Sequence, residues 1–220
     1  ALGLDRRFAR AFAGLSYTEF QNAFQHFGTD VRHHQSLALA HAEEAMKLDP
    51  LDPFCNLIYG RAKWLLGDAE DGLTWVDRAV ELNPNYAFGF YNSATLNTVL
   101  CRSDLADNNI ETALGLSPMD PHLQSMFGTR ALAALIAGDL DAATRYAERS
   151  VKSPNPHLYC FIIAAAVHSG TGAQEKAEHC VHAIRAKGVS FGKTEFLTHF
   201  NLRNPHSLAA VVDNLEKLGL

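Results

Sequence analysis

Small and apolar residues recur along the chain at the three- and four-residue spacings that place side chains on one face of a helix. After Pro50, this pattern predicts a helix to about Leu66, a turn at Gly67-Asp68 and a second helix to about Leu82. On the second helix, Gly72 and Ala79 let the two helices approach closely. The arrangement recurs after three later prolines, with these small or apolar residues on the second helices: Ala106, Ile110 and Ala113; Ala143, Ala147 and Ser150; Ala177 and Ile184.

A proline follows the second helix in four successive segments and defines a period. The segments are Leu48-Asp49-Pro50, Leu82-Asn83-Pro84, Leu116-Ser117-Pro118 and Lys152-Ser153-Pro154, so successive prolines are 34, 34 and 36 residues apart. Proline cannot continue a helix, because it lacks the backbone N–H and clashes with the preceding turn. Self-similarity at this period is typical of a solenoid of two-helix units. We therefore predict an all-α fold, a right-handed α-solenoid of antiparallel helix pairs.

The repeats predict a single domain over residues 1–220. Its units span approximately residues 6–49, 50–83, 84–117, 118–153 and 154–187, and residues 188–220 form closing helices. In the first unit, helices over Phe8–Phe24 and His34–Leu48 flank an insertion around Gly28-Thr29-Asp30. Closing helices are expected over Lys193–His199 and His206–Leu218, because an open helical stack needs a polar-faced end. Residues 1–5 resemble the last turn of an earlier helix, so we expect the chain to be part of a longer protein.

Composition and charge argue against several classes of function. The 19 basic and 24 acidic residues give a formal net charge of −5 without a Lys/Arg cluster, so nucleic-acid binding is not expected. The longest apolar run, Leu158–Val167, is too short to span a bilayer. The four cysteines, Cys55, Cys101, Cys160 and Cys180, show no paired spacing. They are typical of small buried thiols in a reducing compartment, so a cytoplasmic protein is expected.

The repeat positions resemble those of the tetratricopeptide (TPR) repeat. In that repeat, a Leu or Tyr followed by Gly or Ala lies in the first helix, and an Ala, a large apolar residue, a second Ala and a Pro follow. One unit matches at Tyr59-Gly60, Gly72, Val76, Ala79 and Pro84, and the next matches at Ser93-Ala94, Ala106, Ile110, Ala113 and Pro118. Several positions agree together with the period, which makes the match specific.

Two end segments resemble a narrower group of bacterial proteins. Phe8 to Leu15 (FARAFAGL) and Phe200 to Pro205 (FNLRNP) are similar to segments of the TPR region found C-terminal to class III adenylate cyclase domains or winged-helix transcriptional regulators. The tail of that group usually reads Phe-x-Phe-Arg-Asp-Pro, from which Leu202 and Asn204 depart. The resemblance implies a regulatory, partner-binding segment of a signalling protein, with the catalytic or DNA-binding domain upstream.

The TPR resemblance also implies a binding groove, because the first helices of successive units line the concave surface. The residues at those positions combine aromatic rings with hydrogen-bonding groups: Phe54, Leu57, Arg61, Trp64, Phe88, Tyr91, Asn92, Thr95 and Thr98. Such a surface suits a peptide or a helix, whose anchors fill pockets while amides fix the backbone. The alternative is that Phe54 and Trp64 pack between repeats. The Lys/Asn/Arg carboxylate clamp of some TPR domains is not reproduced, because the companion lysines are missing.

No catalytic or metal site stands out in the sequence. The segment Gly188 to Thr194 (GVSFGKT) has three residues between its glycines where a P-loop has four, and no strand precedes it. Two histidine groups lack the four ligands of a tetrahedral metal site: His179 and His182 beside Cys180, and His33, His34 and His41. We therefore expect no metal, no cofactor and no enzymatic activity in this chain itself.

The expected function is binding of a protein or peptide in the groove, where the partner is another protein or a second copy of this chain. Occupancy would regulate the attached domain by favouring one of its two states. The alternative is a small-molecule sensor, whose pocket in the groove is closed by the inserted loop near Gly28 to His34.

Overall fold

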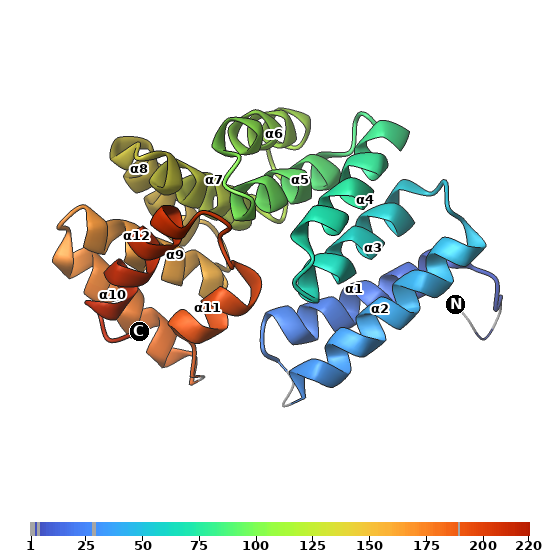
Figure 1. Ribbon diagram of the computed structural model, residues 1–220, viewed down its shortest axis with the longest axis horizontal. Helices are drawn as coiled ribbons and strands as arrows, with labels where there is room; N and C mark the ends of the chain where they lie inside the picture. Colours follow the sequence, from blue (N-terminus) through green and yellow to red (C-terminus); the bar gives the residue numbers. More distant parts are fainter. Residues whose placement is uncertain (1–2, 4, 28–29, 189) are drawn as a thin grey trace. The chain divides into compact units, whose positions relative to one another are not determined.

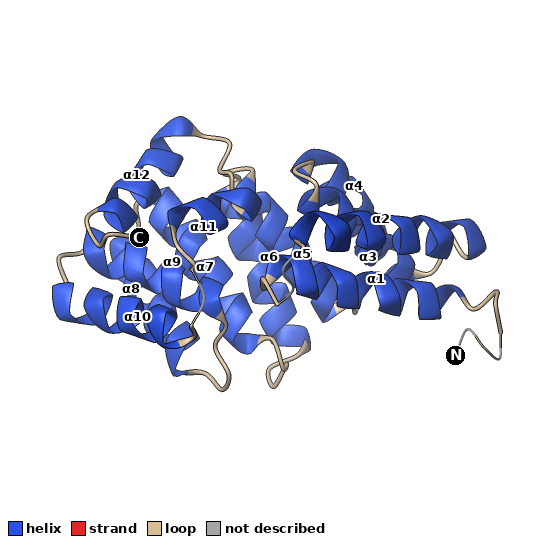
Figure 2. Ribbon diagram, turned by 90° about the horizontal axis from the view of Figure 1, so that it is seen from below, coloured by secondary structure: helices blue, strands red, loops and turns tan. Residues whose placement is uncertain are grey.

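The computed structural model describes the whole chain except residues 1, 2, 4, 28, 29 and 189. The described residues form helices and loops without a strand (Figure 2). Two predicted features lie outside them: the helical turn that includes Ala1, Leu2 and Leu4, and the insertion at Gly28 and Thr29. The all-α prediction is confirmed for the part of the chain that is described.

Twelve helices are formed by the described residues, and Figure 1 follows them from the N-terminus to the C-terminus. They are α1 (Ala9–Phe24), α2 (Val31–Leu48), α3 (Pro53–Leu65), α4 (Ala69–Leu82), α5 (Ala87–Val99), α6 (Ser103–Leu116), α7 (Leu123–Ala137), α8 (Leu140–Lys152), α9 (Leu158–Gly170), α10 (Gln174–Ala186), α11 (Lys193–His199) and α12 (Pro205–Glu216). Each predicted helix is present, with ends within a few residues of those expected.

Local sequence explains where these helices begin and end. Asp52 accepts hydrogen bonds from the backbone N–H groups of Phe54 and Cys55, and Pro53 occupies the first turn of α3, where no N–H is needed. Gly67 follows α3 at a φ of +93°, a left-handed conformation that glycine adopts without a steric penalty. Gly67 therefore lies just after the end of α3, and Asp68 caps the start of α4.

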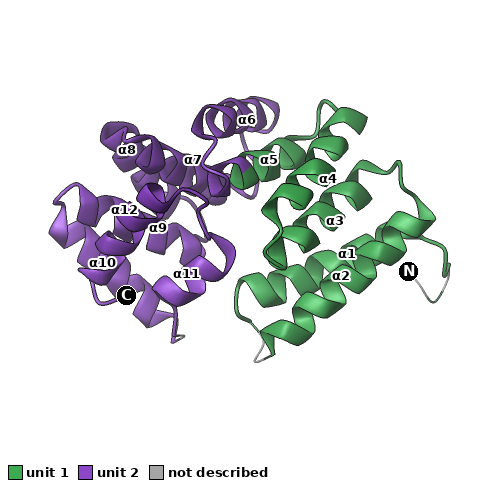
Figure 3. Cartoon of the chain, viewed as in Figure 1, with its two compact units in different colours: residues 1–96 green, residues 97–220 purple. Residues whose placement is uncertain are grey.

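The structure divides into two compact units, residues 1–96 and 97–220, and the boundary falls within α5 (Figure 3). Unit 1 holds α1 to α4 and the first ten residues of α5, from Ala87 to Leu96. Unit 2 holds the end of α5 and α6 to α12.

In unit 1, α1 packs against α2 and α3 packs against α4, while α3 also contacts α1 and α2. Small buried residues face the helix contacts, including Ala38, Ala42 and Ala45 on α2. The closest approach joins α3 to α4 at Gly60 and Gly72, where neither residue has a side chain. The predicted contact face of α4 is confirmed, because Gly72 and Ala79 are buried.

In unit 2, α7 packs against α8, α9 packs against α10, and α9 also contacts α7, α8 and α12. The small residues predicted for the second helices are buried on α6, α8 and α10. Phe200 and Leu202 are buried, and Asn204 accepts hydrogen bonds from the N–H groups of His206 and Ser207 at the start of α12. The FNLRNP segment therefore anchors and caps the closing helix.

One expectation from the cysteines is wrong. Cys55, Cys160 and Cys180 are buried as predicted, but Cys101 is partly exposed. The reason is its position in the turn after α5, where its φ is +59°. A residue in that turn lies outside the helix contacts and cannot join the core.

Candidate functional site

The first helices of unit 1 carry most of the side chains predicted to bind a partner. These helices are α1, α3 and the part of α5 up to Leu96. The ring centroids of Phe88 on α5 and Tyr17 on α1 are 6.2 Å apart. The ring centroids of Phe88 and Tyr91 are 6.1 Å apart. An aromatic surface therefore extends over parts of three first helices. We call Tyr17, Phe20, Arg61, Phe88 and Tyr91 the aromatic cluster of unit 1.

The predicted residues fall into two groups according to their burial. Phe54, Phe88 and Tyr91 are half-buried and keep surface for a partner. Six others are buried: Leu57, Arg61, Trp64, Asn92, Thr95 and Thr98. Of these, Thr98 belongs to unit 2, so it is not part of the surface of unit 1.

Trp64 and Leu57 belong to the core of the protein. The ring of Trp64 lies 5.8 Å from Phe20 and 5.3 Å from Phe24, and the tryptophan is 4% exposed. Leu57 is fully buried. The contacts of Trp64 therefore agree with packing between repeats. Phe54 is half-buried and also packs in part against a core cluster that includes Ala9 and Ala42.

Two polar residues of α5 bond to their own helix. The Nδ2 group of Asn92 donates a hydrogen bond to the backbone carbonyl oxygen of Phe88 at 2.7 Å. The hydroxyl group of Thr95 donates one to the backbone carbonyl oxygen of Tyr91 at 3.0 Å. These bonds occupy one donor on each side chain. The second Nδ2 hydrogen and the carbonyl oxygen of Asn92 are left for other contacts.

Arg61 has the most unusual environment in the cluster. Its guanidinium carbon lies 3.9 Å from the ring centroid of Phe20 and 5.2 Å from those of Tyr17 and Phe88. The residue is 6% exposed, and its Nε is buried without a hydrogen-bond acceptor in the described part of the chain. Burial lowers the pKa of Arg61, and the ionisable groups that oppose this effect are tyrosine phenols. Arginine nevertheless stays protonated at neutral pH.

Unit 1 also contains an ion pair at the start of α3. Asp52, the N-cap of α3, forms an ion pair with Arg10, with Oδ2 and Nε 2.6 Å apart. Hydrogen bonds from Arg10 and from the backbone, together with the charge of Arg10, outweigh burial and lower the pKa of Asp52. The charge of Asp52 is therefore balanced by Arg10.

Sequence reasoning missed Tyr17 and Phe20 as members of the cluster. The TPR pattern was matched only from Tyr59 onward, so it assigned no binding position to the longer first unit. The signal was nevertheless present in the predicted helix over Phe8–Phe24, where Tyr17, Phe20 and Phe24 lie three and four residues apart. That spacing places the three rings on one face of α1.

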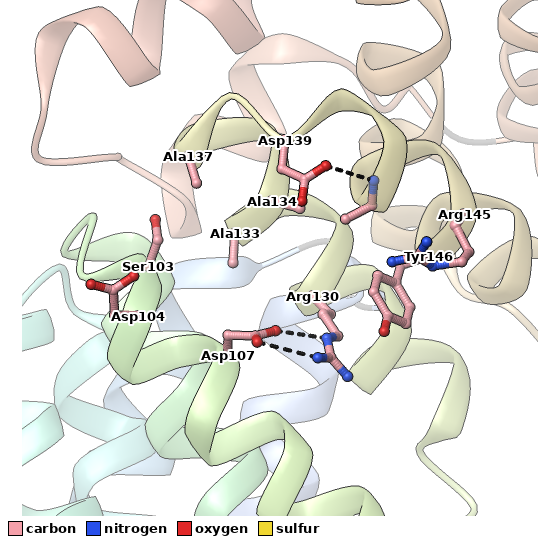
Figure 4. Close-up of a pocket in the computed structure, with 11 residues that line it drawn as sticks. Ser103, Asp104, Asp107, Arg130, Ala133, Ala134, Ala137, Asp139, Arg145 and Tyr146 are labelled. Carbon is pink, nitrogen blue, oxygen red and sulfur yellow. Dashed lines mark hydrogen bonds and ion pairs between the residues drawn. The ribbon is translucent and has the colours of Figure 1, made fainter.

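Unit 2 contains a separate surface cavity of about 290 Å³ between α6, α7 and α8 (Figure 4). Arg130 extends into it and pairs with Asp107, with Nε and Oδ1 2.7 Å apart, and with Glu111 at 3.3 Å. Its guanidinium also lies 4.5 Å from the ring centroid of Tyr146. The charge of Arg130 is thus neutralised by carboxylates, in contrast with Arg61.

The described histidines do not form a metal site. Among the described residues, no group of three or more His, Cys, Asp or Glu side chains is arranged to hold a metal ion. His179 and His182 are exposed on α10, whereas Cys180 between them is buried. In the segment from Gly188 to Thr194, Val189 lies outside the described residues, and Lys193 pairs with Glu216.

No helix in the described ranges is both long enough and apolar enough to cross a bilayer.

Solved structures resemble this fold over most of the chain. The structure from the functional characterisation of Pseudomonas aeruginosa pilF has a TM-score of 0.65 and 15% identity, covering 98% of this chain and 93% of its own. PilW, a widely conserved type IV pilus biogenesis factor, has a TM-score of 0.63 and 17% identity, and the match covers 92% of this chain and 91% of the PilW chain. YrrB, a TPR protein with an unusual peptide-binding site, has a TM-score of 0.52 and 15% identity, and the match covers 100% of this chain and 96% of the YrrB chain.

Sequence comparisons give no closer assignment. No model of a known protein family matches the chain, and no curated protein matches it. The helix pairs, their order and these structural matches together show that the chain has the α-solenoid fold of TPR proteins.

Proposed function

We propose that the chain is a non-enzymatic interaction module that binds a peptide or helix of another protein along the first helices of unit 1. The residues proposed to contact the partner are Phe54, Arg61, Phe88, Tyr91 and Asn92. Leu57, Trp64 and Thr95 support this surface from beneath. The YrrB structure is described as having a peptide-binding site, which agrees with this use of the fold.

The observation that carries the proposal is the half-buried aromatic surface. Phe54 on α3, and Phe88 and Tyr91 on α5, keep part of their surface accessible, although rings of this size are usually buried more completely in a core. Aromatic residues are enriched among the anchors of protein interfaces, since they bury a large area with little loss of side-chain entropy. A segment with apolar anchors would complete their burial.

Selection of displayed peptides on the immobilised 220-residue chain tests the proposal. The dissociation constants of selected peptides are then measured by calorimetry for the native sequence and for Tyr91→Ala. Loss of an aromatic anchor is expected to weaken binding at least tenfold. Tyr146→Ala is the matched control, because Tyr146 is also half-buried but lies on the second helix α8 of unit 2. Failure to select any peptide, or equal binding by Tyr91→Ala, would contradict the proposal.

We further propose that this module is the regulatory region of a larger bacterial signalling protein in the cytoplasm, an adenylate cyclase or a transcriptional regulator. The support is the similarity of FARAFAGL and FNLRNP to segments of such proteins. Sequencing the gene upstream of Ala1 tests this role directly. An upstream cyclase or winged-helix domain is expected, and a gene that begins at this chain would contradict the role.

A second copy of the chain is the other partner expected from the sequence. Sedimentation over a range of protein concentrations distinguishes self-association from binding of another protein. The pocket of the small-molecule sensor expected from the sequence depends on the loop near Gly28 to His34, of which Gly28 and Thr29 lie outside the described part of the chain.

A further inference from the structure

The closing segment, which we define as residues 191–216, lies against the first helix α9 of unit 2. Near the start of α9, the ring centroids of Tyr159 and Phe200 are 5.2 Å apart. At the last residue of α9, a Cβ atom placed on Gly170 would lie 2.5 Å from Nδ2 of Asn214 on α12. The closing segment therefore contacts α9 at both of its ends.

An aromatic residue is the second residue of three first helices: Phe54 of α3, Phe88 of α5 and Tyr159 of α9. Phe54 and Phe88 are half-buried, and the proposed function assigns them to a partner. Tyr159 is 1% exposed, and Phe191 and Phe200 lie against its ring at centroid distances of 4.9 and 5.2 Å. In unit 2, the chain itself thus fills the position that in unit 1 is proposed for a partner.

The closing segment does not have the form of a further repeat. In the repeat units the two helices of a pair pack along each other, as α9 and α10 do, whereas α11 and α12 meet at few residues and α12 packs on α9 (Figure 1). The segment also reaches beyond the last pair, because the N–H of Arg203 donates to the carbonyl oxygen of Val99 at 3.1 Å. Val99 ends α5, two units earlier. A segment that only closed the end of the stack would need to contact α9 and α10 alone.

The contact between α9 and the closing segment is apolar. From Leu158 to Val167, α9 carries no charged residue. The charge of Lys193 is balanced within the segment by Glu216. Four large apolar side chains that precede α12 are each 5% exposed or less: Phe191, Phe196, Phe200 and Leu202. Recognition on this surface therefore depends on aromatic and aliphatic anchors.

On the basis of the proposed function, we propose that α9 and the end of α5 form a second binding surface, which the closing segment occupies until a partner helix displaces it. The partner would carry two phenylalanines four residues apart. This is the spacing of Phe196 and Phe200, whose rings stack with centroids 5.1 Å apart on one side of a helical turn. An uncharged aromatic face would replace the contacts that the closing segment makes.

Release of the closing segment is local, because the helix pairs of a solenoid contact only their neighbours and the segment follows the last pair. Helix α11 has seven residues, too few for a stable helix by itself, so its structure depends on the surface beneath it. Displacement would therefore unfold α11 and leave the pairs up to α10 in place.

Hydrogen exchange of the native 220-residue chain tests this release. The backbone amides of α11 and α12 are expected to exchange at least tenfold faster than those of α7 and α9, because local opening needs less free energy than unfolding of the unit. Equal protection would show that the segment leaves only when unit 2 unfolds, and would overturn the proposal.

A synthetic peptide with the sequence of residues 190–205 tests displacement. Phe200→Ala removes a contact between the segment and Tyr159 and leaves the surface of α9 unchanged. The peptide is expected to bind this variant at least tenfold more tightly than the native chain, as measured by fluorescence anisotropy. Phe127→Ala is the matched control and should bind like the native chain, because Phe127 is also buried in unit 2 but stacks with Tyr146 on α8.

The peptide in which both phenylalanines are replaced by alanine is expected not to bind. Equal binding of this peptide, or equally tight binding of the original peptide to Phe200→Ala and Phe127→Ala, would overturn the proposal. Absence of any binding to Phe200→Ala would do the same. A Phe200→Ala chain whose unit 2 does not fold would show that the segment belongs to the core, which also contradicts displacement.

The two proposals fail in different ways. Peptides that bind through Tyr91, together with a closing segment that the synthetic peptide cannot replace, would leave the interaction module of unit 1 intact and exclude the second surface. Binding of the synthetic peptide to Phe200→Ala without selection of any peptide on the native chain would have the opposite meaning.

Discussion

A Cβ atom placed on Gly60 would lie 2.5 Å from the carbonyl oxygen of Gly72, and one placed on Gly72 would lie 2.7 Å from the carbonyl oxygen of Gly60. Helices α3 and α4 therefore meet backbone to backbone. Both glycines occupy positions of the TPR pattern that call for a small residue. The separation of this helix pair depends on the absence of both side chains.

Gly72→Ala is expected to lower the free energy of unfolding by about 1–3 kcal/mol, because the added methyl group meets backbone that cannot rotate away. Denaturation by urea, followed by circular dichroism, measures the change. Gly115→Ala on α6 is the control, because nothing lies within 4 Å of the added carbon. The control is expected to gain about 0.5–1 kcal/mol from helix propensity. Equal effects at the two sites would contradict the close-contact explanation.

Cys101 occupies the turn position that Gly67 occupies 34 residues earlier, and both residues have positive φ, +59° and +93°. Left-handed backbone costs a residue with a Cβ roughly 1–2 kcal/mol. Glycine removes that strain but increases the entropy of the unfolded chain, which offsets about 0.4–1 kcal/mol. Cys101→Gly is therefore expected to raise stability by up to about 1 kcal/mol in urea denaturation. A loss of stability would show that the side chain itself supports the turn.

The stability of unit 2 is expected to decrease in acid because of His157. Its Nε2 lies 2.7 Å from the Ser125 hydroxyl, and burial, followed by the charge of His122, lowers the pKa of His157 from 6.5 to about 4. Below pH 6.5 the unfolded chain binds a proton that the folded chain does not. The contribution of His157 is therefore fully present above pH 6.5, and about 3 kcal/mol is lost as pH falls to 4.

His157→Gln isolates this effect, because glutamine can still bond to Ser125 but does not titrate. The free energies of unfolding of the native chain and of His157→Gln are measured at several pH values between 4 and 7, and their difference is followed with pH. The buried His168, whose pKa is also lowered by burial, is present in both proteins, so its contribution cancels in the comparison. An identical pH dependence in both proteins would exclude His157 as its source.

The cysteines are expected to differ in their reactivity. Burial raises the pKa of the thiols of Cys55, Cys160 and Cys180 to about 12, 11 and 11, so little thiolate forms at neutral pH. Cys101 is partly exposed. Iodoacetamide is therefore expected to alkylate one site rapidly in the native protein, as measured by mass spectrometry of its peptides. All four should react in denaturant, and rapid native labelling at Cys160 would contradict the buried assignment.

Much of the helix arrangement could be predicted because its signals are local. The signals are the prolines that end the first four units, the Gly-Asp pair at 67–68 and the small residues of α4. Each acts within a few residues of its own helix. The turn after α5 escaped this reasoning, because Cys101 carries none of the usual sequence signals for a left-handed residue. Its conformation is set by the helices on either side of the turn.

The candidate site was only partly predictable. The positions of Phe54, Phe88 and Tyr91 on first helices follow from the repeat, and these side chains keep exposed surface. Trp64 follows the same pattern but is buried against Phe20 and Phe24. Periodicity gives the face on which a residue lies. It does not give the side chain that covers that residue from another helix.

The sequence by itself determined the helix pairs, their 34-residue period and the small residues at their contacts, because these depend on interactions within one repeat. The tertiary structure decided the environment of Arg61. Phe20 and Phe88, which stack on it, lie 41 and 27 residues away along the chain, on two other helices. Whether a buried charge meets a ring or a carboxylate depends on side chains brought together only by packing, and no local pattern encodes that choice.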